Sequence, residues 1–394
     1  MRPTDGPQQR DAWPSYVAIA TIGYVIYGIG ATTPYLRAQL GLSDAQLGLH
    51  STAMAVGLLV VGVGVARLDR RLGEVAVRGL AIVLLSIAVI GLATAIAFGA
   101  TLASALLIGA GTGTLLGYAN ATLVRPGGSL GRVRVARANV WAMVAAFVCP
   151  VLLAGTASVG VPFGWGLAPA LVLLAILAVD LRAGPRLAPD PIAAEGPPVN
   201  GDDRTSDRHL PRAYWLAWTF LVAAIAVEFS IVQWAATLIA SRTGADTAGA
   251  TILAGLFLGG MFVGRLAQSA GLGTHGGVRR PAAIFASLAL AGVVVVWLAT
   301  VPLLAGVAIF VAGTGVAGLY PLGVAAALST APDRLALAGS RLTLASGIAV
   351  LLAPLALGIV ADMAGVVTGW VLVVAAAVAA LVLVAVLPAG EGAA

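Results

Sequence analysis

The residue with the clearest chemistry in this sequence is Glu228, a lone acid deep inside a long apolar segment. It lies about 15 residues after Ala213, which is about 22 Å along a helix. A charge in hydrocarbon costs at least about 2.5–3.5 kcal/mol, so such an acid normally faces protein or water and has a function. We expect Glu228 to take up and release a proton. The alternative is a structural acid that bonds a nearby hydroxyl or arginine.

Tyrosine, tryptophan and amide side chains are the other groups in apolar segments that could hold a ligand. Aromatic rings with a polar edge suit a small organic molecule in an apolar hollow. The candidate substrate-binding residues are Tyr24, Tyr27, Tyr118, Asn120, Gln233, Trp234 and Tyr320. Alternatively, such residues lie at the membrane interface or bond across helices. On an ideal helix Gln233 shares a face with Ser230 and Thr237, and Glu228 points nearly opposite.

Other catalytic chemistry has few candidates here. A Walker loop is impossible because the chain has no lysine, and Cys149 is the single cysteine. Histidine and cysteine form no cluster that would bind a metal. We therefore expect neither a cofactor nor a metal, and no enzymatic activity.

The composition predicts the elements that must position these residues. The chain has 394 residues, of which 60% are hydrophobic and 10% charged, whereas soluble domains are about 25% charged. A soluble fold of this length could not cover so much apolar surface. The sequence is therefore that of a polytopic, all-α membrane protein, since its continuous apolar runs do not alternate as in a β-barrel.

A helix needs about 20 apolar residues to cross a bilayer, and twelve segments qualify. The shortest turns are expected near 98–100, near 300–302 and around Asp362. The predicted spans are 13–37, 46–67, 76–98, 101–124, 136–157, 162–182, 213–240, 248–268, 281–300, 303–328, 338–361 and 366–388.

Arginine sets the expected orientation. If the N-terminus is cytoplasmic, only Arg37 and Arg242 of the 22 basic residues fall outside, as the positive-inside rule demands. Both termini are then cytoplasmic. The net charge of +6 needs no nucleic-acid partner, because anionic lipid headgroups lie on the same side. The first apolar run is too long for a signal peptide and is kept as the first helix.

A polar, proline-rich stretch at 184–212 divides the twelve spans into six and six. The predicted domains are an N-terminal bundle at 1–183, a cytoplasmic linker at 184–212 and a C-terminal bundle at 213–394. The halves share short matches: residues 110–113 and 312–315 both read Ala-Gly-Thr-Gly, which pairs Tyr118 with Tyr320 at an offset of 202. A second match pairs Arg67 with Arg265 at an offset of 198.

Two parallel six-helix repeats joined by a cytoplasmic linker resemble the major facilitator superfamily (MFS). That family has the loop signature G-x-x-x-D-R-x-G-R-R, which residues 62–71 match at the first glycine and at three arginines, with Ala66 in place of the acid. The resemblance implies a central cavity lined by the first, fourth, seventh and tenth helices, and a gate at the loop. The candidate gating residues are Arg67, Asp69, Arg70, Arg71 and Arg265.

The resemblance implies secondary active transport of a small organic molecule by alternating access, and Glu228 makes protons the expected coupling ion. Few charges lie within the spans, so we expect a neutral, lipophilic or weakly charged substrate. Efflux of drug-like compounds or metabolites by an antiporter is preferred, and uptake of a sugar or similar neutral solute is the alternative. A polytopic receptor or membrane enzyme is the alternative of another class. We expect a monomer in the plasma or bacterial inner membrane, with substrate, protons and lipid as its only partners.

Overall fold

The computed structural model describes residues 12–125, 128–182, 210–269 and 277–387. Within these ranges it is helical and has no strand, and twelve helices are long and apolar enough to cross a membrane. The prediction of twelve spans in an all-α fold is confirmed. The predicted linker, 184–212, lies almost wholly outside the described residues.

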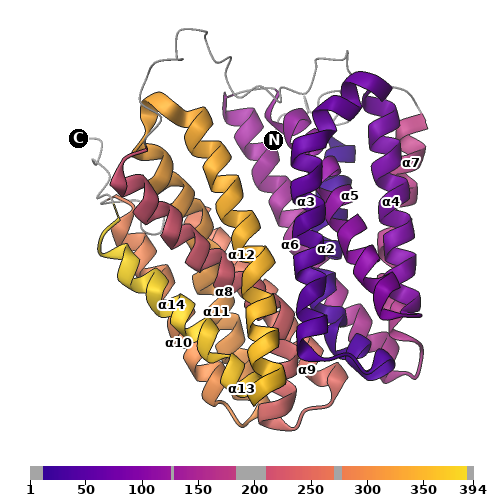
Figure 1. The fold of residues 1–394 in the computed structure, drawn as a ribbon, viewed down its shortest axis with the longest axis vertical. Helices are drawn as coiled ribbons and strands as arrows, with labels where there is room; N and C mark the ends of the chain where they lie inside the picture. The colour runs from indigo at the N-terminus through magenta and orange to yellow at the C-terminus, as the bar shows by residue number, and fades with distance from the viewer. Residues whose placement is uncertain (1–11, 126–127, 183–209, 270–276, 388–394) are drawn as a thin grey trace, which may run out of the picture. The chain divides into compact units, whose positions relative to one another are not determined.

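The first compact unit contains six membrane-length helices, drawn from indigo to magenta in Figure 1. Its elements are α2 (Trp13–Leu40), α3 (Asp44–Leu72), α4 (Glu74–Thr94), α5 (Phe98–Val124), α6 (Gly128–Ser158), the 3-10 turn η1 (Phe163–Leu167) and α7 (Ala168–Arg182).

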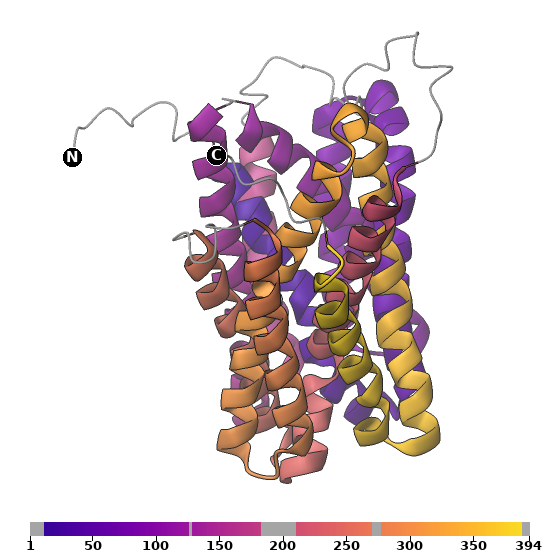
Figure 2. The same cartoon turned by 90° about the vertical axis from the view of Figure 1, so that its left-hand side faces the viewer.

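Apart from the start of α3, the second unit is drawn in colours from rose to yellow (Figure 2). Its elements are α8 (Arg212–Thr243), α9 (Thr247–Ser269), α10 (Arg279–Leu298), α11 (Pro302–Ser329), the 3-10 turn η2 (Pro332–Arg334), α12 (Leu335–Ala364), α13 (Val366–Gly369) and α14 (Val371–Val384). It also includes Ser43–Thr52, the start of α3, whereas the rest of α3 packs in the first unit.

The short turns lie close to their expected places, each displaced by one to three residues. The first turn falls at 95–97 and not at 98–100, where α5 has already begun. Another occupies 299–301, and the third is centred on Gly365, three residues after Asp362. Glycine ends α2 at Gly41 and α8 at Gly244 in a left-handed conformation that bonds back to the preceding turn.

Both units bring their helices together through glycines at the same internal positions. A Cβ added to Gly109 of α5 would lie 1.9 Å from the backbone oxygen of Met54 in α3, and one added to Gly313 of α11 would lie 2.0 Å from that of Phe257 in α9. Small residues at such points let helix backbones approach closely in a membrane. Since 313 − 109 = 204 and 257 − 54 = 203, the two units repeat at an offset of 203–204.

A second pair of glycines gives the same offset. Gly111 packs against Ala81 of α4, and Gly315 packs against Phe285 of α10, so both differences are 204. The offset of 202 predicted from the Ala-Gly-Thr-Gly match is therefore wrong by two residues, which is about 200° around a helix. The Ala-Gly-Thr-Gly match in these glycine-rich helices therefore aligned residues of α5 and α11 that pack against different neighbours.

The corrected offset separates two residues that the sequence match had paired. Tyr118 is buried, with 6% of its surface exposed, whereas Tyr320 is 45% exposed. At an offset of 204, Tyr118 corresponds to Leu322 and not to Tyr320. The pairing of Arg67 with Arg265 is also wrong, because the packing of α3 and α9 repeats at 203 and not at 198.

Candidate functional site

Glu228 occupies the middle of α8, the longest helix in the described part of the chain. It lies 16 residues after Arg212 and 15 before Thr243, the two ends of that helix. Only 7% of its surface is exposed, and the adjacent Val227 and Ile231 are fully buried. The structure therefore places this acid at a buried position at the centre of a span. An ionisable group inside a span normally faces protein or water and marks a candidate functional site.

Gln233 lies about one and a half turns beyond Glu228 and is 2% exposed. Its Nε2 donates to the backbone oxygen of Leu47 at 3.1 Å, and its Oε1 accepts from the hydroxyl of Ser51 at 3.0 Å. Both partners belong to the Ser43–Thr52 segment of the second unit. In this conformation both polar atoms of the Gln233 amide therefore bond α3.

Trp234 is fully buried against α12. Its indole Nε1 donates to the backbone oxygen of Pro354 at 2.9 Å, and its ring lies 3.0 Å from where a Cβ on Gly358 would be. The absence of a side chain at Gly358 thus makes room for the ring. Trp234 holds α8 against α12 in this conformation.

The first unit contains a polar cluster where α3, α4 and α5 meet. The hydroxyl of Tyr118 donates to Oδ1 of Asp69 at 2.7 Å. The guanidinium of Arg78 lies 6.0 Å from the centre of the Tyr118 ring and forms a 3.1 Å ion pair with Glu74. Asp69, a predicted gating residue, and Tyr118, a predicted substrate ligand, therefore bond each other.

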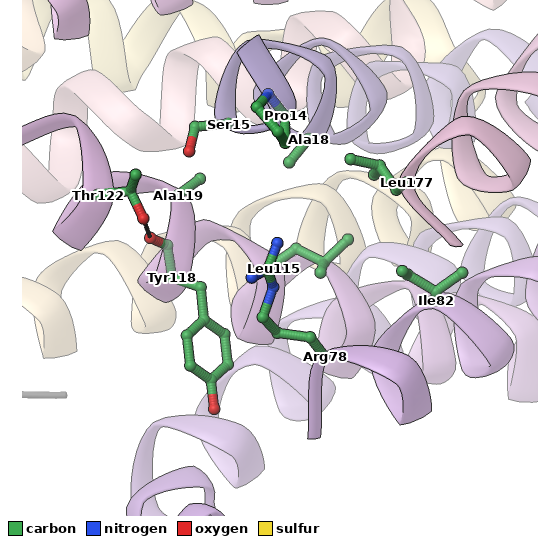
Figure 3. A pocket seen from close by; sticks show the side chains of 10 residues that line it. All are labelled: Pro14, Ser15, Ala18, Arg78, Ile82, Leu115, Tyr118, Ala119, Thr122 and Leu177. Atoms are coloured by element: carbon green, nitrogen blue, oxygen red, sulfur yellow. Dashed lines mark hydrogen bonds between the residues drawn. The ribbon is translucent and has the colours of Figure 1, made fainter. Parts of the chain in front are cut away.

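A small cavity adjoins this cluster. Figure 3 shows it between the start of α2, with Pro14 and Ser15, and the side of α5 that carries Tyr118 and Thr122. The space open to the centres of water molecules is about 20 Å³, which is enough for about one water. The cavity is therefore too small for an organic substrate in this conformation.

The other predicted ligands differ in burial. Tyr24 is 2% exposed, and its hydroxyl donates to the backbone oxygen of Gly166 in η1, so it ties α2 to that turn. Tyr27 is half-buried in α2. Asn120 in α5 is exposed, as is Tyr320 in α11. Their role in substrate binding stays a prediction.

The predicted gating arginines lie near the ends of α3 and α9. Arg67, Arg70 and Arg71 are exposed in the last turns of α3. Arg265 is half-buried, four residues before the end of α9 at Ser269, and its Nε is buried without a hydrogen bond in the described part of the chain. The polar loop end of α3 thus carries three exposed cations beside Asp69.

Sequence reasoning missed Asp362 of α12, which bonds the start of α3, and Ser51 of α3, which bonds Gln233 of α8. Asp362 was interpreted only as a turn marker. The sequence did carry a local signal at the start of α3, the segment that Asp362 bonds. Ser43-x-x-Gln46 is a capping box and marks the beginning of that helix. Among the residues that the structure describes, no group of three histidine, cysteine or acidic side chains could hold a metal.

No protein-family profile and no curated protein sequence matches this chain. Solved structures are similar to it. The peptide transporter POT has a TM-score of 0.72 at 17% identity, covering 95% of this chain and 94% of its own. A bacterial homologue of the human lysosomal transporter Spinster has 0.71 at 15% identity, with 97% and 98% covered.

A third similar structure is FucP, described as an MFS transporter and as the E. coli fucose:proton symporter. The latter structure has a TM-score of 0.59 at 15% identity, with 94% of this chain and 97% of the other covered. The chain therefore has the MFS fold over nearly its whole length, as its sequence predicted.

Proposed function

We propose, for a chain with the MFS fold, secondary active transport of a small organic molecule by alternating access. The observation that carries the proposal is the combination of this fold with one buried acid, Glu228, at the centre of a span. The fold supplies two related helical units, and the acid supplies a group whose charge changes when it binds a proton. Protons are the proposed coupling ion, and FucP is an example of a proton symporter with this fold.

Efflux of a lipophilic or weakly charged compound is the preferred direction, because the spans contain few charges that would recognise an ionic solute. Uptake of a neutral polar solute is the second candidate. It is favoured by the buried amide and hydroxyl of Gln233 and Ser51, which offer the hydrogen bonds that a sugar-like molecule needs. The proposed setting is a plasma or inner membrane with both termini in the cytoplasm.

Glu228→Gln tests the coupling. Purified protein in proteoliposomes is first screened for a transported solute, and concentrative flux is then measured under an imposed gradient of one pH unit. Such a gradient is worth about 1.4 kcal/mol per proton, or tenfold accumulation for one proton per solute. We expect Glu228→Gln to lose the accumulation but to keep exchange of labelled for unlabelled solute. Asp246→Asn, an acid in the turn before α9, is the matched control.

Two results would count against parts of this proposal. Accumulation by Glu228→Gln equal to that of the wild type would exclude Glu228 as the proton carrier. In cells, net inward accumulation that an uncoupler abolishes would replace efflux by uptake. Transport of no solute by the reconstituted protein, together with a hydrolytic activity lost in Glu228→Ala, would overturn the transport proposal itself.

A further inference from the structure

The start of α3 is capped in two ways. Within the helix, the hydroxyl of Ser43 accepts from the backbone N–H of Gln46 at 3.3 Å, and Oε1 of Gln46 accepts from the N–H of Ser43 at 3.0 Å. The N–H groups of Asp44 and Ala45 take no part in this reciprocal capping box, and in the first turn of a helix they lie too early to bond a carbonyl four residues back in the same helix.

Asp362 of α12, more than 300 residues further along the chain, supplies both missing acceptors. Its Oδ1 accepts from the N–H of Asp44 at 2.6 Å, and its Oδ2 accepts from the N–H of Ala45 at 2.9 Å. Hydrogen bonds to a charged acceptor are about twice as strong as neutral ones, and the start of a helix also carries a partial positive charge. One side chain thus holds a helix that is remote from it in sequence.

The following residues of α3 also pack closely on α12. A Cβ on Gly48 would lie 2.9 Å from Cα of Leu355, so only glycine fits there without displacement. The hydroxyl of Thr52 donates to the backbone oxygen of Leu351 at 2.7 Å. From Ala53 onwards the same helix packs in the first unit, where Gly57 lies against Leu106 of α5. A continuous helix is therefore shared between the two units, and its first residues are held by α12.

We propose that Asp362 is the latch that holds Ser43–Thr52 on α12 and that its release from the start of α3 is a step of the working cycle. The role in a cycle rests on the proposed function, whereas the latch itself does not. A carboxylate suits this task because its two bonds are directional and are lost together when the helix start moves away. The two N–H groups and the carboxylate then form hydrogen bonds with water in place of those with each other. The bonded state is therefore stable but reversible, as a moving part requires.

The test measures how often Ser43–Thr52 leaves α12. Leu47→Cys places a thiol at a fully buried position of this segment. The background is Cys149→Ala, which removes the only native thiol. The rate of maleimide labelling in detergent is compared with and without Asp362→Ala. We expect labelling to be at least fivefold faster in Asp362→Ala, and about twofold faster in Asp362→Asn, which keeps one acceptor.

Asp246→Asn is the matched control, because the hydrogen bond that Asp246 accepts in the described part of the chain is local, from the N–H of Gly249 in the first turn of α9. It should label at the unaltered rate. Equal rates with and without Asp362→Ala would overturn the latch, as would an equal rise in Asp246→Asn. Should Asp362→Ala not give monodisperse protein, the Asp362→Asn comparison decides in the same way. Labelling requires no substrate, so a faster rate in a protein that transports nothing would support the latch while refuting the proposed function.

Discussion

At the scale of single residues, the polar cluster of the first unit includes Asp69, which lies in the stretch that resembles the family's loop signature. The MFS loop signature has an acid where this chain has Ala66, and the nearest carboxylate is that of Asp69. The structure gives Asp69 a definite partner, the hydroxyl of Tyr118, with Arg78 beside the same ring. The acid is therefore held towards α5, at the end of α3 that carries the exposed arginines.

Tyr118→Phe tests the contribution of that hydrogen bond. The substitution keeps the ring beside Arg78 and removes only the hydroxyl, so we expect the free energy of unfolding to fall by about 1 kcal/mol. Denaturant unfolding in detergent measures it. Tyr320→Phe, at an exposed tyrosine, should change nothing. In the variant pair Tyr118→Phe and Asp69→Asn the losses should be less than additive, and strict additivity would show that the bond contributes no stability.

The sequence could identify the candidate residues but not their partners. Glu228 was recognisable because charge inside an apolar run is rare, and the structure does place it buried at mid-span. Gln233 and Trp234 were recognised as polar or aromatic positions of α8. Their actual contacts, Leu47 and Pro354, depend on which helices adjoin α8. Helical periodicity gives the face of a helix but not the identity of its neighbour.

At the scale of elements, hydrophobic run length was sufficient to find all twelve helices. The predicted alignment of the two halves was wrong, because the repeated Ala-Gly-Thr-Gly tetrapeptides are not structurally equivalent. What repeats is the place where glycine lets two backbones meet, as at Gly109 in α5 and Gly313 in α11. A backbone contact of this kind leaves no distinctive sequence letters, since every helix here is rich in small residues.

Gly313→Ala tests this interpretation of the packing. The added methyl would lie 2.0 Å from the backbone oxygen of Phe257, so α11 and α9 must separate. Overpacking of this kind costs about 1–3 kcal/mol, and we expect a matching loss in unfolding free energy. Gly117→Ala in α5, where no atom lies within 4 Å of the new Cβ, is the control. It should be neutral or slightly stabilising, since alanine favours helix. Equal effects at both sites would refute the packing role of Gly313.

At the scale of the whole molecule, composition and the distribution of arginine predicted a two-part, twelve-helix membrane protein. The MFS fold is now shown, whereas the orientation of the termini and the boundaries of the two domains stay predictions. Substrate recognition could not be derived from the sequence, because the sequence does not show which residues of different helices come together around a ligand.

Single cysteines test the orientation. In the Cys149→Ala background, Thr300→Cys lies in the turn between α10 and α11, and Asp333→Cys lies in the turn between α11 and α12; both positions are exposed. With cytoplasmic termini, a membrane-impermeant maleimide should label Thr300→Cys on intact cells and Asp333→Cys only after permeabilisation. The reverse pattern would invert the proposed topology. Cys149→Ala alone shows the background labelling.

The assignment of Ser43–Thr52 to the second unit affects how the protein could be divided. A fragment that ends after α7 would carry about ten residues whose natural surroundings are missing, and the apolar side chain of Leu47 would face solvent or detergent. In the complementary fragment, Leu351 and Leu355 of α12 would lose their contacts with this stretch. Independent production of the second half therefore calls for a graft of this short stretch, supplied as a peptide or fused ahead of α8.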